Sequence, residues 1–207
     1  MRPEGALARL FSAVFHPLVM PTVGMIILFQ LNTYIRFSIP DPARRFLLVI
    51  MFLNTALAPL LSVYVLRHTK MVAHMSLEDR QDRLLPLLVT SLFFIFTYYL
   101  LKQLNLPSLI YYYVMGAAIL VLTSLMITFR WKISLHMVSL GGFTGFLISS
   151  ALLLKTDMAW LIMLCFLVSG AVGTSRLILK AHSQAQVYAG YILGMAVMLI
   201  LYAYLRV

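Results

Sequence analysis

Seven apolar stretches of about 20 residues run along the chain, and each is long enough to cross the hydrocarbon core of a bilayer as a helix. Polar and charged residues gather in the segments between them, and the period-two alternation that is typical of membrane β-barrels is absent. This pattern predicts an all-α polytopic membrane helical bundle with about seven transmembrane helices, or six. The stretches are residues 11–31, 46–66, 85–104, 109–129, 133–154, 159–179 and 187–205.

Three prolines, Pro17, Pro21 and Pro59, lie inside the first two stretches. A proline removes one backbone donor from a helix and leaves a carbonyl without its partner. Neighbouring helices can satisfy such carbonyls within a membrane. We therefore expect kinks at these positions, and helices that continue through them.

The composition supports the same architecture, because 62% of the 207 residues are hydrophobic and only 11% are charged, against about 45–50% and 25% in soluble proteins. So few charges cannot cover the surface of a soluble domain of this size. The chain is expected to be a single integral membrane domain, residues 1–207, with any chemistry at the helix ends. The one cysteine, Cys165, lies within an apolar stretch and is expected to serve packing.

The charges are strongly basic, with 16 Lys and Arg against 6 Asp and Glu. Seven crossings place the N-terminus and the connections after the second, fourth and sixth stretches on one side, which we call the even face. It carries ten Lys and Arg residues against six opposite, with four of the five histidines on or near it, so a site for an anion is expected there. The positive-inside rule does not decide the orientation of the chain. Four of the ten Lys and Arg residues on the even face are candidate site residues, and without them each face carries six. The four are Arg80, Arg83, Lys132 and Arg176.

Two clusters on the even face could bind phosphate. Arg80 and Arg83 are three residues apart, so on a helix they would share one face and could grip phosphate oxygens bidentately. The alternative is a solvated loop in which nearby aspartates pair with them. Lys132 and His136 are four residues apart at the start of the fifth stretch, so on a helix they would share one face, and a helix N-terminus there favours an anion. The alternative there is a lysine that snorkels to the interface beside an interfacial histidine.

The third cluster follows the sixth stretch and contains Ser175, Arg176, His182 and Gln186. Ionisable residues at membrane depth are costly and usually functional. The alternative is an arginine that anchors the helix, followed by a capping histidine. We favour the functional interpretation because cation, imidazole and carboxamide lie within twelve residues of one another.

This third cluster, Ser175-Arg176-x5-His182-x3-Gln186, resembles the third motif of the type 2 phosphatidic acid phosphatase superfamily, Ser-Arg-x5-His-x3-Asp, with glutamine in place of aspartate. That superfamily includes bacterial lipid phosphatases and vanadium haloperoxidases. Its second motif, Pro-Ser-Gly-His, is similar to residues 133–136, which keep Ser134 and His136. Its first motif, Lys-x6-Arg-Pro, is retained only loosely as Arg80-x2-Arg83-x2-Pro86. The resemblance covers about residues 76–194, a phosphatase-like core.

The resemblance implies a two-step phosphoryl transfer in which His182 attacks phosphorus and His136 protonates the leaving oxygen. The substrate would be a phosphate or pyrophosphate ester of an isoprenoid or phosphatidyl lipid in the bilayer, in a bacterial inner membrane. Neither a metal, a cofactor nor nucleic acid is implied as a partner. Gln186 would take the orienting position, and the expected phosphate-binding residues are Arg176, Arg80, Arg83, Lys132, Ser134 and Ser175.

The glutamine at position 186 keeps two functions open. A carboxylate there would fix the histidine tautomer and stabilise the imidazolium, whereas a carboxamide does only the first. In a serine protease triad the corresponding Asp→Asn change costs about 10⁴ in turnover. The chain could be a lipid phosphatase, with a carboxylate from Glu78, Asp79 or Asp82 standing in, or a non-catalytic descendant that binds a phospholipid headgroup.

The two histidine motifs are followed by glycine pairs with the same spacing. Gly141-x3-Gly145 lies in the fifth stretch and Gly190-x3-Gly194 in the seventh. Small residues spaced in this way allow membrane helices to approach closely. We therefore expect these helices to pack against each other and to bring His136 and His182 together.

Overall fold

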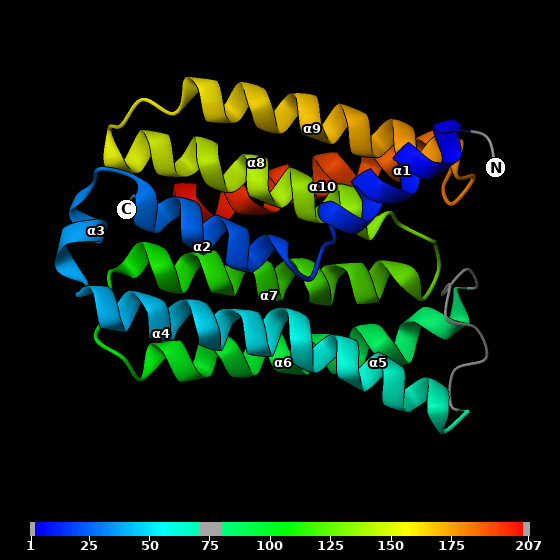
Figure 1. Cartoon of the computed structure of the whole chain (residues 1–207), viewed down its shortest axis with the longest axis horizontal. Helices are drawn as coiled ribbons and strands as arrows, with labels where there is room; N and C mark the ends of the chain where they lie inside the picture. The colour runs from blue at the N-terminus through cyan, green and yellow to red at the C-terminus, as the bar shows by residue number, and fades with distance from the viewer. Residues whose placement is uncertain (1–2, 71–79, 205–207) are drawn as a thin grey trace. The chain divides into compact units, whose positions relative to one another are not determined.

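The computed structural model describes residues 3–70 and 80–204, and this part of the chain is helical throughout, without a strand (Figure 1). A π-helical turn, η1 (Leu53–Leu57), joins α4 to α5, and a 3₁₀ turn, η2 (Gln81–Arg83), leads into α6. The predicted all-α fold is therefore confirmed for the described residues. The α-helices are α1 (Pro3–Val14), α2 (Met20–Gln30), α3 (Tyr34–Ser38), α4 (Asp41–Phe52), α5 (Ala58–His68), α6 (Leu84–Lys102), α7 (Ser108–Thr128), α8 (Leu135–Leu154), α9 (Ala159–Ile178) and α10 (Gln184–Tyr204).

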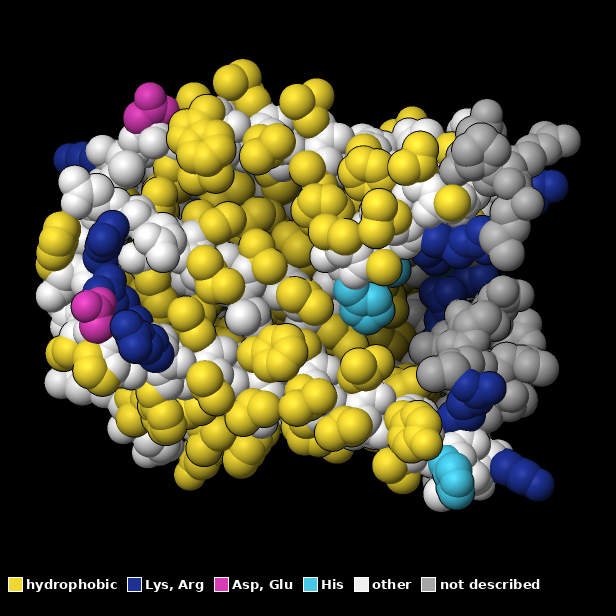
Figure 2. Space-filling model, viewed as in Figure 1, with side chains coloured by type: hydrophobic (Ala, Val, Ile, Leu, Met, Phe, Trp, Pro, Cys, Tyr) yellow, Lys and Arg dark blue, Asp and Glu magenta, His cyan; other side chains and the backbone are white. Residues whose placement is uncertain are grey.

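Six helices in the described residues are long and apolar enough to cross a membrane. The chain is thus a polytopic helical bundle and an integral membrane protein. Figure 2 shows apolar side chains over most of the visible face, as lipid contact requires. On α9, for example, Trp160 is 62% exposed and Leu167 is 72% exposed. The six spans are Asp41–His68, Gln81–Lys102, Ser108–Thr128, Leu135–Leu154, Ala159–Ile178 and Gln184–Tyr204.

The first apolar stretch, residues 11–31, is not one kinked helix, so this expectation is wrong. It forms two shorter helices, α1 and α2, separated by residues 15–19. Pro17 has no N–H and disfavours the helical conformation of His16 before it, so α1 ends at Val14. The last carbonyls of α1 consequently lose their partners within the helix.

The second stretch passes through its proline as expected. The proline at position 59 cannot donate to the carbonyl four residues earlier, and the helix widens there into η1. Two side chains bond to carbonyls of the preceding turn: Asn54 to Ile50 (3.0 Å) and Thr55 to Met51 (2.8 Å). The helix therefore continues from Asp41 to His68.

The chain divides into two compact units, Met1–Met20 with Lys132–Val207, and Pro21–Trp131. In the first unit α8 lies along α10, and α9 packs on α8 and on α1. A Cβ at Gly141 would overlap the Tyr191 carbonyl of α10, and one at Gly194 would overlap the Val138 carbonyl of α8. The predicted close packing of these two helices is confirmed.

In the second unit α6 lies along α7, and the long helix from α4 to α5 packs on α6. Buried hydroxyl groups within the helices bond to carbonyls four residues earlier, as Thr90 does to Pro86 (2.7 Å) and Ser124 to Leu120 (2.7 Å). Such bonds satisfy hydroxyl groups that lipid cannot. These hydroxyl groups therefore have a partner within their own helix.

Candidate functional site

The candidate site belongs to the first unit, where the end of α1, the starts of α8 and α10, and the end of α9 meet. Three contacts join these elements. Ser12 of α1 bonds to His136 of α8 and to Arg176 of α9, and the Ser134 N–H donates to the Gln186 carbonyl of α10 at 3.4 Å. Segments more than 160 residues apart in the chain therefore contribute to one polar cluster.

His182 is held by Gln186 at the start of α10. The side chain of His182 is 8% exposed, and its Nδ1 lies 3.0 Å from Gln186 Oε1. The same Oε1 accepts the Ser183 N–H (3.2 Å), while the Ser183 hydroxyl accepts the Gln186 N–H (3.4 Å). Ser183 and Gln186 thus form a capping box on the helix.

This capping box determines the histidine tautomer. Only the oxygen of a carboxamide can accept from a backbone N–H, so the Ser183 contact fixes which way the Gln186 amide faces. The Nδ1 atom of His182 must then carry the proton that Oε1 accepts. In neutral His182 the lone pair is consequently on Nε2, which is the form that a nucleophile requires.

His136, the second residue of α8, directs a proton at an oxygen atom. Its Nε2 lies 3.0 Å from the carbonyl oxygen of Ser12. A carbonyl only accepts, so Nε2 is the donor. The break after α1 makes this contact possible, because Ser12 lies in the last turn of that helix and its carbonyl needs a partner. The charge of Arg176 and the imidazole of His182 are both close enough to act electrostatically on His136.

Arg176 presents a guanidinium to the same cluster. Its Nη1 lies 3.4 Å from the Ser12 hydroxyl oxygen, and its Nε is buried without a hydrogen bond in the described structure. A buried donor without a partner is costly and suits an anion. The neighbouring Ser175 is different, because its hydroxyl donates to the Ala171 carbonyl (2.8 Å) and has no hydrogen left to offer a phosphate.

His16 is a member of the cluster that the sequence analysis missed. Its ring meets that of His136 edge to face with centroids 5.6 Å apart, and its Nδ1 accepts the Leu18 N–H at 3.4 Å. Burial, and after it the charge of Arg176, lowers the pKa of His16 below its usual value. The sequence does contain one sign of a role for His16, because it is an ionisable residue inside an apolar stretch, directly before a proline.

Two expected phosphate ligands lie just before α8. Ser134 is fully buried, and its hydroxyl has no partner in the described structure. Lys132 precedes the helix by three residues, so the expectation that it shares a helical face with His136 is wrong. Its place among the phosphate ligands stays a prediction, as does that of Ser134.

The remaining expected residues belong to the unit Pro21–Trp131. Arg80 donates from Nη1 to the Arg130 carbonyl at 2.7 Å, and Arg83 is buried at the end of η2. One carboxylate oxygen of Asp82 is buried without a hydrogen bond among the described residues. Glu78 and Asp79 lie outside the described residues. The roles of these side chains as phosphate ligands or as a replacement carboxylate stay predictions.

The assembled groups are an imidazole whose neutral form has its lone pair on Nε2, a second imidazole whose Nε2 donates a hydrogen bond, and a guanidinium whose Nε has no hydrogen bond in the described structure. This set suits attack on phosphorus and neutralisation of phosphate charge. Within the described residues no group of three or more His, Cys, Asp or Glu side chains could hold a metal ion. Comparison of the chain with protein families, curated proteins and solved structures finds no match.

Proposed function

We propose that the protein is a lipid phosphatase that hydrolyses a phosphate or pyrophosphate ester of a bilayer lipid through a phosphohistidine at His182. The observation that carries the proposal is the contact of His182 Nδ1 with Gln186, since it leaves the lone pair on Nε2. The sequence motifs around Ser134, His136 and Arg176 add support, because they resemble those of the type 2 phosphatidic acid phosphatases. The same resemblance suggests a bacterial inner membrane as the location.

The reaction proceeds in two displacements. The Nε2 lone pair of His182 attacks phosphorus, the bond from phosphorus to the lipid or bridging oxygen breaks, and His136, which must enter this step as the imidazolium, gives one proton to that oxygen and becomes neutral. Water then attacks the phosphohistidine, the phosphorus–nitrogen bond breaks, and the proton of the water returns to His136. Arg176 neutralises charge on the phosphate oxygens throughout.

Ser12 supports the assignment of His136 and Arg176. The carbonyl oxygen of Ser12 accepts from His136 and its hydroxyl oxygen accepts from Arg176, at 3.0 and 3.4 Å. A phosphate ester offers oxygens to the same donors. Phosphate oxygens that bind these two donors replace those of Ser12, so the end of α1 competes with substrate for them.

A second candidate, a protein that binds phospholipid headgroups without turnover, is favoured by one observation. Gln186 is neutral, so it orients His182 but stabilises no positive charge on the ring. The same hydrogen-bond donors would then hold a lipid phosphate without cleaving it. The two candidates differ in whether phosphate is released.

The test is phosphate release from detergent micelles that contain phosphatidic acid or a polyprenyl diphosphate. We expect the parent protein to release phosphate. In the His182→Ala and His136→Ala variants the rate of release should fall by a factor of at least about 10³. His68→Ala is the control, because His68 is an exposed histidine in the other unit. Equal rates in all four proteins would rule out the phosphatase. No release by the parent, with binding of lipid phosphate that weakens in Arg176→Gln, would support the second candidate.

A further inference from the structure

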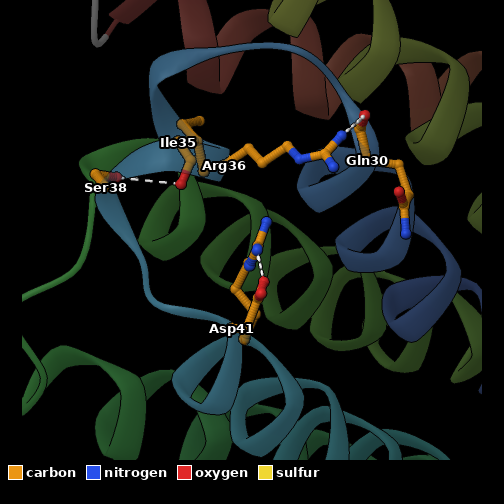
Figure 3. Close-up of polar contacts among 6 residues, drawn as sticks. Gln30, Ile35, Arg36, Ser38 and Asp41 are labelled. Carbon is orange, nitrogen blue, oxygen red and sulfur yellow. Dashed lines mark hydrogen bonds and ion pairs between the residues drawn. The ribbon is translucent and has the colours of Figure 1, made fainter.

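A second basic site lies in the unit Pro21–Trp131, and none of its lining residues belongs to the histidine cluster. A pocket of about 200 Å³ opens between the end of α2, the short α3 and the first turns of α4. Three arginines line it, Arg36, Arg44 and Arg45, and we call it the arginine pocket. Figure 3 shows Arg36 extending from α3 to the end of α2, where its Nη1 donates to the Gln30 carbonyl at 3.3 Å.

The charge of the arginine pocket is not balanced by the residues that line it. Asp41 is the one carboxylate among them, and it pairs with Arg44. The side chain of Asp41 is 71% exposed, so water screens its charge, whereas that of Arg44 is only 18% exposed. Each guanidinium carries five N–H donors, far more than one carboxylate and one carbonyl can accept. The pocket therefore retains positive charge and donors for an anion.

Apolar side chains also line the arginine pocket. Phe29 of α2 and Leu48 of α4 line it beside the arginines. Apolar surroundings strengthen the attraction between a guanidinium and an anion.

The arginine pocket lies at one end of a membrane-spanning helix, because Asp41 begins the span Asp41–His68. Lipid phosphates are found at that depth, where the hydrocarbon core gives way to water. Guanidinium groups bind phosphate bidentately, which distinguishes them from lysine. We propose that the arginine pocket binds the phosphate group of an anionic membrane lipid, at a site separate from the histidine cluster.

Simple anchoring of the helix by positive charge is the competing explanation. Anchoring depends on charge alone, so lysine would serve as well as arginine. Recognition of phosphate by forked donors predicts a loss in the triple variant with Arg36, Arg44 and Arg45 changed to lysine. The comparison of arginine with lysine at constant net charge thus separates the two explanations.

The experiment is native mass spectrometry of the full chain in detergent with added phosphatidic acid, phosphatidylglycerol, phosphatidylcholine or inorganic phosphate. We expect the two anionic lipids to bind, and Arg36→Gln or Arg44→Gln to weaken that binding about tenfold or more. Asp41→Asn removes the competing carboxylate and should strengthen binding several-fold, a gain that a misfolded protein could not show. Arg67→Gln is the control, because it removes the same charge at the other end of the same span.

The proposal is overturned by unchanged lipid binding in Arg36→Gln, by an equal loss in Arg67→Gln, by equal binding of phosphatidylcholine, or by undiminished lipid binding in the triple lysine variant. If inorganic phosphate competes at concentrations similar to those of the lipids, the pocket binds free phosphate, and the proposal that it binds a lipid is contradicted. The histidine cluster is tested separately, since Arg36→Gln should leave phosphate release unchanged. If lipid binding is lost only in Arg176→Gln, and in none of the arginine pocket variants, all binding lies at the histidine cluster and the proposal is also contradicted.

Discussion

Changing Gln186 to Glu tests the proposed chemistry most directly. Glutamate has the length of glutamine, so its carboxylate can keep both contacts of Oε1, with His182 Nδ1 at 3.0 Å and with the Ser183 N–H at 3.2 Å. It also forms the Ser-x-x-Glu capping box and places a negative charge in the first turn of α10, both of which stabilise a helix. The variant therefore alters the charge beside His182 and leaves the geometry in place.

The expected gain follows from Coulomb's law. Opposite unit charges about 4 Å apart attract by about 4 kcal/mol at the effective dielectric constant of 20 that suits sites near a protein surface. Since about 1.36 kcal/mol changes a rate tenfold, this corresponds to a factor of about 10³ for a step that forms the imidazolium. Residue 186 is partly exposed, and screening reduces the gain, so we expect turnover to rise by about 10² to 10³.

The assay is phosphate release from phosphatidic acid micelles by the parent protein, Gln186→Glu and Gln184→Glu. Gln184 is exposed in the same helical turn, so its variant has the same net charge without touching His182. The reasoning is refuted if Gln186→Glu keeps its thermal unfolding midpoint and gains no rate, or if Gln184→Glu gains as much. A carboxylate from residues 78–82 that already stabilises His182 would also remove the gain, and neutralising that carboxylate should then abolish turnover.

Three further predictions concern the first unit. Ser12→Ala removes the hydroxyl contact of Arg176, so vanadate titration should show several-fold tighter binding, whereas unchanged or weaker binding would mean that Ser12 does not compete with phosphate. Gly194→Ala places a Cβ against the backbone of α8 and should destabilise the protein by about 1–3 kcal/mol in denaturant unfolding. Gly170→Ala is the control, because its Cβ meets open space and should not destabilise the protein; equal effects of the two changes would contradict the close packing. The pKa of His16 is lowered in the folded protein, so below about pH 6.5 the unfolded state binds more protons than the folded state and the free energy of unfolding should fall as the pH is lowered. His16→Asn should reduce this fall, measured as the unfolding midpoint against pH. The same pH profile in the variant and the parent would refute the assignment.

The sequence was sufficient for those features that depend on local pattern. The long spans follow from apolar length, and the contact of α8 with α10 follows from the glycine spacing of each helix. The break in the first stretch was not predictable in this way, because whether a proline kinks or ends a helix depends on which partner donates to the carbonyls freed at the break. Here that partner is His136, which is 124 residues away from Ser12 in the chain.

The same reason limited prediction of the candidate site. The His182 and Gln186 contact is local, four residues apart, and could be read from the spacing of the third motif. His16 and Ser12 enter the site through tertiary contacts with α8 and α9, and no spacing within the first stretch encodes them. The shared helical face of Lys132 and His136 was wrong because α8 begins only at Leu135.

The close contact of α8 with α10 determines which part of the site can move. Their backbones meet at Gly141 and Gly194 with no side chain between them, so His136 and His182 are carried by what is mechanically one body. α1 packs on α9 and reaches α8 through the hydrogen bond from His136 to the carbonyl of Ser12. Under the proposed function, phosphate oxygens replace those of Ser12, so we expect spin labels on α1 and α10 to separate when vanadate binds while labels on α8 and α10 keep their distance.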